Sequence, residues 1–257
     1  MLSLKGMAVR QQKEVQAIIG ELKFPEPVNP VVSLPPHKLS CVMSYPPSGA
    51  LLAAQLVTEM AWDARFNGIT YGGEGVKKGS RVQADFHANL DLDGAAPKEL
   101  EAMADATWNT ECDRYSVVLT MNGGLVMHMV KSVRGIMGSS AEVEGYASLK
   151  ASEVVEEAIE TARAFGVYDG VPIVLGTDSV ANLQVARRQS AATRLRHALR
   201  RWETLMERVA AGKVKLVHIG DAEMPADFLT KWVPAKKLER SIAYVTNSAN
   251  RLKHPNE

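Results

Sequence analysis

Residues 115–133 read YSVVLTMNGGLVMHMVKSV, and this stretch decides the fold. Its first part, residues 115–121, is rich in β-branched side chains, which favours a strand. Asn122-Gly123-Gly124 follows, and these residues tolerate the positive φ angles of a tight hairpin turn. Residues 125–133 are then expected to return as a second strand. The stretch therefore predicts two neighbouring antiparallel strands.

More strands and helices are expected on both sides of this hairpin. Residues 103–108 predict a strand before it, and Ser140 is expected to begin a long helix that runs to about Phe165, with Gly166 after its end. The later elements are a strand at 171–177, helices at about 179–187 and 191–211, a strand at 213–219 and a final helical region from Pro225 to about 248. Three consecutive strands, followed by strands that alternate with helices, predict an α/β fold. We expect a mixed five-stranded sheet, with three antiparallel strands and then parallel ones, flanked by helices.

The first hundred residues give a weaker pattern. Residues 7–22 and a segment from Ser48 to about Ala64 predict helices, and residues 68–71 predict a short strand. Between the two helices, regular structure is expected to be broken by Pro25, Pro27, Pro30, Pro35 and Pro36. Residues 74–100 are expected to form a connector.

The composition limits the class of protein. The chain has 257 residues, 46% of them hydrophobic, with a net charge of +1, which suits one large domain or one domain with an appendage. Its two cysteines, Cys41 and Cys112, lack metal-ligand spacing, so a disulfide scaffold is not expected. The longest apolar run, residues 50–57, is too short to span a bilayer, and the N-terminus has no signal-peptide pattern. We expect an intracellular protein, cytoplasmic or nuclear, that is not secreted and has no membrane partner.

Four short segments each place a carboxylate at or near the end of an apolar stretch. Asp105 and Asp178 are expected at strand ends, where ligand sites form in such sheets. Glu144 is expected in the first turns of the long helix, and Asp227 at the N-terminus of the last helix. Carboxylates gathered in one place raise one another's pKa unless a cation is present. Because all the donors are oxygens, the sequence predicts a site for a hard divalent metal, magnesium.

Other interpretations of single residues remain open. An aspartate at a strand end is more often a turn former or helix cap than a ligand, so the prediction depends on the four acting together. Glu142 is the alternative to Glu144, because Gly145 weakens the helix beside it; Glu142 is otherwise expected to be a solvated helix residue. Trp108 and Trp232 are expected in the core or at its rim.

Six short motifs stand in order along the second half of the chain. They are Asp105-Ala106-Thr107-Trp108, Asp113-Arg114-Tyr115-Ser116 with Gly123-Gly124 after it, Ser139 to Glu144, Asp178-Ser179, Arg194-Leu195-Arg196-His197 and Ala226 to Lys231. Through these motifs and their separations, residues 104–244 resemble the ribonuclease H domain of copia-type long-terminal-repeat retrotransposon polyproteins. The chain departs from that pattern at Thr107, where the family has a second Asp, and at Ser179, where it has Asn.

The resemblance implies an enzyme that cleaves the RNA strand of an RNA–DNA hybrid. It implies that Asp105, Glu144, Asp178 and Asp227 bind two magnesium ions, or manganese, roughly 4 Å apart. One ion would activate the attacking water and the other would stabilise the leaving oxygen. It also implies that Arg194, Arg196 and His197 contact the substrate.

Residues 46–73 resemble the end of the reverse transcriptase region that precedes this domain. The resemblance therefore implies three regions: 1–99, a remnant of the reverse transcriptase thumb or connection with a linker; 100–248, the ribonuclease H-like domain; and 249–257, a tail. The polymerase motif Tyr-x-Asp-Asp is absent from the sequence, so DNA synthesis is not expected, and the polymerase portion of the polyprotein is an expected partner. Two alternatives stay open: a catalytically inactive nucleic-acid-binding remnant, and a domain that shares only the fold.

Overall fold

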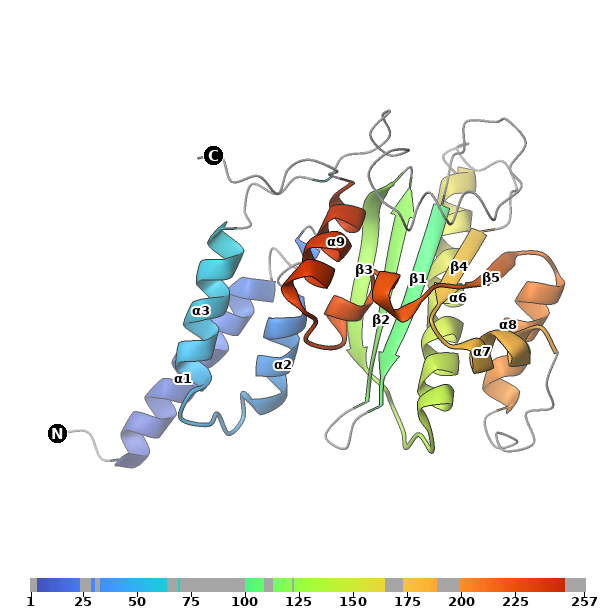
Figure 1. Ribbon diagram of the computed structural model, residues 1–257. Helices are drawn as coiled ribbons and strands as arrows, with labels where there is room; N and C mark the ends of the chain where they lie inside the picture. Colours follow the sequence, from blue (N-terminus) through green and yellow to red (C-terminus); the bar gives the residue numbers. More distant parts are fainter. Residues whose placement is uncertain are drawn as a thin grey trace. The chain divides into compact units, whose positions relative to one another are not determined.

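The computed structural model describes residues 4–23, 29–30, 33–63, 69, 100–108, 113–121, 123–164, 173–188 and 199–247 (Figure 1). The chain divides into two compact units, residues 1–68 and 69–257. Within the described residues, no helix has both the length and the apolar character needed to cross a bilayer.

The described residues of the first unit form three helices, α1 (Leu4–Lys23), α2 (Leu34–Val42) and α3 (Ala50–Asp63). Helices α1 and α3 match the two predicted helices. The prediction that prolines break regular structure up to residue 36 is wrong, because Pro35 and Pro36 lie in the first turn of α2. A proline there costs no hydrogen bond, since the first N–H groups of a helix have no partner within it. Of the strand predicted at 68–71, only Ile69 is described, and it lies in no strand.

The second unit is built on a five-stranded sheet in the order β3-β2-β1-β4-β5. Its strands are β1 (Leu100–Thr107), β2 (Arg114–Met121), β3 (Gly124–Ser132), β4 (Ile173–Thr177) and β5 (Val214–His218). The pairs β1–β2 and β2–β3 are antiparallel, whereas β1–β4 and β4–β5 are parallel. In the hairpin turn, Gly123 has a φ of 79°, as the turn prediction requires. The predicted mixed sheet is confirmed.

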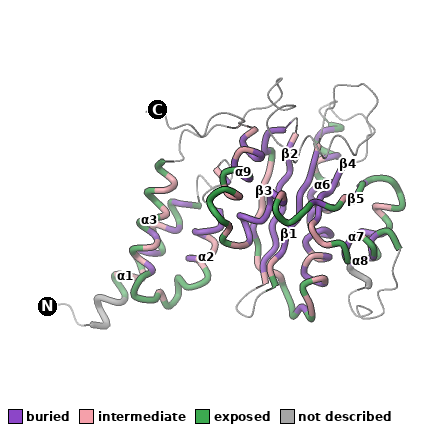
Figure 2. Tube along the Cα trace, in the orientation of Figure 1, coloured by how far each residue is buried: buried purple, intermediate pink, exposed green. Residues whose placement is uncertain are grey.

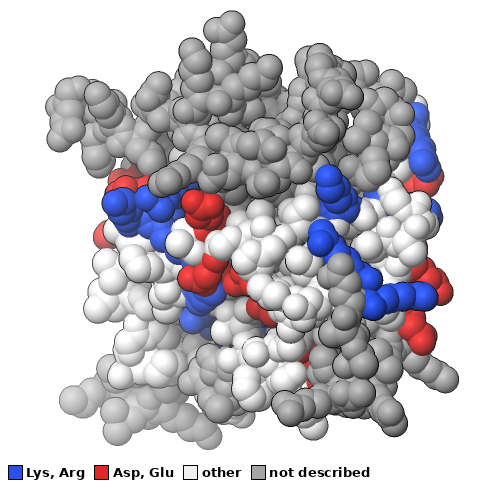
Figure 3. All heavy atoms as spheres, turned by 45° about the vertical axis from the view of Figure 1, so that its right-hand side comes forward, with Lys and Arg blue, Asp and Glu red and all other residues white. Residues whose placement is uncertain are grey.

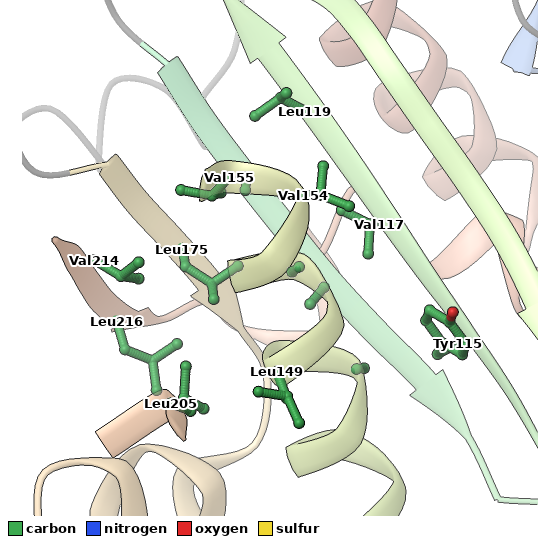
Figure 4. Close-up of a cluster of buried hydrophobic side chains, with 14 of the residues drawn as sticks. Tyr115, Val117, Leu119, Leu149, Val154, Val155, Leu175, Leu205, Val214 and Leu216 are labelled. Atoms are coloured by element: carbon green, nitrogen blue, oxygen red, sulfur yellow. The ribbon is translucent and has the colours of Figure 1, made fainter. Parts of the chain in front are cut away.

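The two faces of the sheet carry separate cores, because successive side chains of a strand point to opposite faces. On one face, Ala102 and Ala104 of β1 pack with side chains of α6 (Ser140–Ala164) and α8 (Leu199–Ala210). Figure 4 shows this core, to which β2, α6, β4, α8 and β5 all contribute. On the other face, Met103 packs with Tyr244 of α9 (Ala235–Thr246). The central strands are accordingly buried along most of their length (Figure 2).

Helices α6 and α8 come unusually close at Gly145. A Cβ atom added at Gly145 would lie 1.7 Å from Nε1 of Trp202, a buried residue of α8. Glycine in a helix costs roughly 1 kcal/mol relative to alanine. At this position the missing side chain leaves space that the indole ring of Trp202 fills. Close packing of the two helices therefore explains why glycine stands here although it weakens α6 locally.

The last part of the chain differs from the prediction of one helix beginning at Pro225. It forms two short 3-10 turns, η4 (Asp221–Glu223) and η5 (Asp227–Leu229), before α9 begins after Pro234. Pro234 inside a continuous helix would remove a hydrogen bond and clash with the preceding turn. The helix therefore starts only after this proline, and Asp227 lies in a short turn and not at a helix N-terminus.

Candidate metal centre

Three carboxylates from three separate elements meet at one end of the sheet. Asp105 lies near the end of β1, Glu144 in the second turn of α6, and Asp178 directly after β4. One oxygen of each lies within 4.8 Å of the others. Because β1 and β4 are parallel neighbours, their carboxyl ends lie at the same edge, which brings Asp105 and Asp178 together.

A second group of three carboxylates shares Asp178 with the first. It comprises Asp178, Asp221 and Asp227, again with one oxygen of each within 4.8 Å of the others. Asp227 is fully buried, whereas Asp221 is exposed. The structure thus brings all four predicted residues into two overlapping groups. Asp221 was not predicted; its place three residues after β5 follows the same strand-end rule and could have indicated it.

Two lysines lie among these carboxylates, and the sequence analysis missed both. The Nζ of Lys231 is 3.1 Å from Oδ1 of Asp227, 3.5 Å from Oδ1 of Asp221 and 3.8 Å from Oδ1 of Asp105. The Nζ of Lys237 contacts Oδ2 of Asp227 and lies 3.7 Å from Oδ1 of Asp221. Lys231 ends the sixth motif, which was the available signal. On the face shown in Figure 3, basic side chains lie beside acidic ones.

Hydroxyl groups fasten the η5 turn to the sheet. The hydroxyl of Thr230 donates to Oδ2 of Asp105 and lies 3.1 Å from the backbone oxygen of Asp227. The hydroxyl of Ser116, on β2, donates to the backbone oxygen of Ala226 at 3.1 Å. These contacts bring Asp227 to the end of the sheet although it lies far from Asp105 along the chain.

The electrostatics of the centre oppose a full set of negative charges. Burial, and then the charges of Asp227 and Glu144, raise the pKa of Asp105 well above its ordinary value. Burial, and then Asp178, raise the pKa of Glu144 to about 8. Burial, and then Asp227, also raise the pKa of Asp178. Burial lowers the pKa of Lys231, but the charges of Asp105 and Asp227 outweigh it and leave that pKa above its usual value.

The donor set fits a hard divalent cation. Two buried carboxylate oxygens of the centre make no hydrogen bond to any described residue, Oδ1 of Asp105 and Oε2 of Glu144, while Oδ1 of Asp227 pairs with the Lys231 ammonium at 3.1 Å. A buried acceptor without a donor costs about 1–3 kcal/mol, and more when it is charged. Clustered oxygen donors are the ligands that magnesium and manganese take in proteins. The residues present therefore suit the predicted metal.

Glu142 has a structural position outside both carboxylate groups. It is buried, so the expectation of a solvated helix residue is wrong. Its Oε2 accepts a hydrogen bond of 2.9 Å from the backbone N–H of Gly138, and its own N–H donates to the hydroxyl of Ser139. This reciprocal arrangement resembles a capping box, which stabilises the start of a helix. Of the two glutamates, only Glu144 lies in one of the two clusters of three carboxylates described above.

A polar network holds the elements that carry the carboxylates. Asn182, on α7 (Val180–Ala186), donates from Nδ2 to the hydroxyl of Ser148 at 2.6 Å and to the backbone oxygen of Glu144 at 3.4 Å. Ser179 caps α7 by accepting from the N–H of Asn182, which gives this departure from the family pattern a structural role. The Nε2 of His218 lies 3.1 Å from the backbone oxygen of Asp178.

The remaining predicted residues divide into two sets. Arg194, Arg196 and His197 lie outside the described residues. Trp108 and Trp232 are both exposed, so neither is a core residue.

Comparison with known proteins identifies relatives that align with most of the chain. No family model matches it. It is 22% identical over 233 residues to the retrovirus-related Pol polyproteins from transposons RE1 and RE2 of Arabidopsis thaliana, an alignment that covers 88% of this chain and 14% of each relative. Similar solved structures include ribonuclease H1 from the archaeon Halobacterium salinarum NRC-1, with a TM-score of 0.37 and 19% identity over 51% of this chain and 93% of that one. Another is LC11-RNase H1 in complex with an RNA/DNA hybrid, with a TM-score of 0.38 and 18% identity over 51% of this chain and 93% of that one. The resemblance seen in the motifs is confirmed by the two plant relatives, and the chain is homologous to retrovirus-related Pol polyproteins of transposons.

Proposed function

We propose that residues 100–248 form a ribonuclease H-type endonuclease that uses divalent metal ions to hydrolyse the RNA strand of RNA–DNA hybrids. The observation that carries this proposal is the meeting of Asp105, Glu144 and Asp178 within 4.8 Å, on three elements far apart in the chain. The homology to Pol polyproteins supports it, since the six motifs resemble the ribonuclease H domain of such proteins.

The side chains around the centre have separate tasks in this proposal. Asp105, Glu144, Asp178 and Asp227 hold the metal, and Thr230 fixes the carboxylate of Asp105 by donating to its Oδ2. A bound divalent ion supplies Lewis-acid polarisation of the phosphodiester and of the attacking water.

Two further residues act as positioning residues. Asn182 holds the backbone of Glu144, and His218 lies against the backbone oxygen of Asp178. Neither side chain needs to reach the substrate, because each fixes the main chain that carries a ligand.

Two further assignments rest on the motifs and the homology. Arg194, Arg196 and His197 are proposed to contact the substrate backbone, since arginine binds phosphate with paired hydrogen bonds. The polymerase portion of a polyprotein is a proposed partner, because the chain spans 14% of the length of the relatives it matches.

The test is cleavage of an RNA–DNA hybrid labelled on either strand, with magnesium or manganese titrated from zero. The parent protein is expected to cut the RNA strand only when metal is present. Asp178→Asn is expected to abolish cutting and to melt at a temperature no lower than the parent, because the change removes repulsion among carboxylates. Asp63→Asn makes the same chemical change at the exposed end of α3 and should cut like the parent.

Two results would contradict the proposal. One is an Asp178→Asn variant that cuts as fast as the parent. The other is hybrid binding with a steep salt dependence but no cleavage at any metal concentration, which would instead favour the inactive nucleic-acid-binding remnant.

A further inference from the structure

The two lysines of the centre are distributed unequally between the carboxylate groups. In the Asp105–Glu144–Asp178 group, Lys231 forms one ion pair, with its Nζ 3.8 Å from Oδ1 of Asp105. The Asp178–Asp221–Asp227 group is met by both lysines, each of which pairs with Asp221 and with Asp227. The second group therefore holds two ammonium groups in ion pairs where a metal ion would bind, whereas the first group has a single ion pair, with Lys231 at the longer distance of 3.8 Å.

The two ammonium groups also differ in how firmly they are held. The side chain of Lys237 is 14% exposed, and its Nζ contacts the backbone oxygen of Asp221 as well as the carboxylate of Asp227. The side chain of Lys231 is 36% exposed, and its three carboxylate contacts lie between 3.1 and 3.8 Å. Because Asp227 is fully buried, its pairs are screened weakly by solvent. Lys237 is thus an internal anchor, and Lys231 is the ammonium group that can move towards solvent.

Repulsion between Lys231 and a second ion favours one ion when no nucleic acid is bound. Five carboxylates, those of Asp105, Glu144, Asp178, Asp221 and Asp227, face two ammonium groups. When all are ionised, one divalent ion leaves one negative charge and two ions leave one positive charge, so the net charge alone does not choose between one ion and two. A second ion near Asp227 would also lie close to Lys231, and like charges at such distances in a partly buried site repel strongly.

We propose that Lys231 controls the metal occupancy of this centre. With Lys231 in place, the protein takes one divalent ion, at Asp105, Glu144 and Asp178, and the Asp178–Asp221–Asp227 group accepts a second ion only when the Lys231 ammonium leaves. A phosphate of a bound nucleic acid is an anion that can draw this partly exposed ammonium away, so substrate binding and completion of the metal centre are coupled. The inference rests on the proposed function in taking the carboxylates as a divalent-ion centre.

The test counts bound manganese without nucleic acid and without measuring cleavage. Free Mn²⁺ is followed by its electron paramagnetic resonance signal during titration of the full chain. The parent is expected to bind one ion tightly, and Lys231→Met is expected to bind a second ion at least tenfold more tightly than the parent does. Lys231→Arg keeps the charge and should behave like the parent. Lys236→Met removes the neighbouring exposed lysine of α9 and should change nothing.

Circular dichroism of each variant establishes that it is folded. Should Lys231→Met fail to fold, Lys231→Gln is the second variant, because it also removes the charge and has the same expected gain in affinity for the second ion. The inference is overturned if the parent binds two ions with equal affinity, or if both uncharged Lys231 variants bind Mn²⁺ as the parent does.

The failure of this inference differs from that of the proposed function. Unchanged Mn²⁺ binding in the variants, together with hybrid cleavage by the parent, refutes the role of Lys231 alone. The expected binding pattern without hybrid cleavage refutes the nuclease alone. If neither the parent nor any variant binds Mn²⁺, both proposals are refuted.

Discussion

Glu101 gives the most quantitative prediction, because it is a buried carboxyl group away from the metal centre. It lies on β1, and its Oε2 accepts a hydrogen bond of 3.0 Å from the hydroxyl of Tyr244 on α9. Burial raises its pKa from 4.5 to about 7, an effect that the Tyr244 hydrogen bond only partly opposes. The folded protein therefore favours the protonated form more than the unfolded chain does.

The direction of the pH dependence follows from this raised pKa. Protons bound to Glu101 stabilise the folded state fully below pH 4.5, and that stabilisation is lost as the pH rises towards 7. Each unit of pKa difference corresponds to about 1.4 kcal/mol, so the loss is about 3 kcal/mol across this range. Glu101→Gln cannot ionise, and its amide oxygen can still accept from Tyr244, so the variant should lack this loss.

The assay is urea unfolding of the parent and Glu101→Gln between pH 4 and pH 8.5. The free energy of unfolding of the variant, relative to that of the parent, should rise by about 3 kcal/mol from the acidic to the alkaline end. Any constant difference in packing cancels in this comparison, as does the titration of every other group. Glu160→Gln, at an exposed position of α6, should show a constant difference. A constant difference for Glu101→Gln as well would refute the reasoning.

Three further predictions concern the packing and the metal centre. Gly145→Ala should lower the free energy of unfolding in urea, because crowding against Trp202 costs about 1–3 kcal/mol and exceeds the roughly 1 kcal/mol gained in helix propensity; an equal or higher stability would contradict the close packing. Asn182→Ala should lose about 1–3 kcal/mol in the same assay, since it leaves the buried hydroxyl of Ser148 without this donor. Magnesium at 100 times its dissociation constant should stabilise the parent by about 2.7 kcal/mol, measured as a higher melting temperature. The same concentration should raise the melting temperature of Asp178→Asn much less, and equal increases would exclude Asp178 as a ligand.

The parts of the fold that were predicted correctly depend on local chemistry. The hairpin follows from β-branched residues on either side of Asn122-Gly123-Gly124, because such a turn fixes the pairing of its two strands. The parallel strands follow from the alternation of strands with helices, which requires crossover connections. The meeting of Asp105 and Asp178 was predictable for the same reason, since parallel neighbours end at one edge of the sheet.

The parts that were missed depend on contacts between distant segments. Asp227 was predicted at the centre but at the N-terminus of a helix, whereas it lies in the η5 turn. Hydrogen bonds from Thr230 and Ser116 hold that turn against the sheet, and no local pattern encodes them. From the sequence, Gly145 only weakens its helix, because the reason for it is the close packing of Trp202 from another helix. The lysines of the centre were missed because a lysine in a sequence is ordinarily a solvated surface residue.

The centre also shows why its arrangement suits binding of a cation better than stability. Asp105 and Asp227 are fully buried; Oδ1 of Asp105 accepts no hydrogen bond from a described residue, and Oδ1 of Asp227 faces the Lys231 ammonium at 3.1 Å. Such oxygens destabilise the folded chain unless a cation compensates them. Lys231 supplies part of that compensation, although burial and then the neighbouring carboxylates still raise the pKa values of Asp105 and Glu144. A divalent ion supplies further compensation at the same carboxylates, so the free energy that makes the site costly for folding is also what favours binding of the metal.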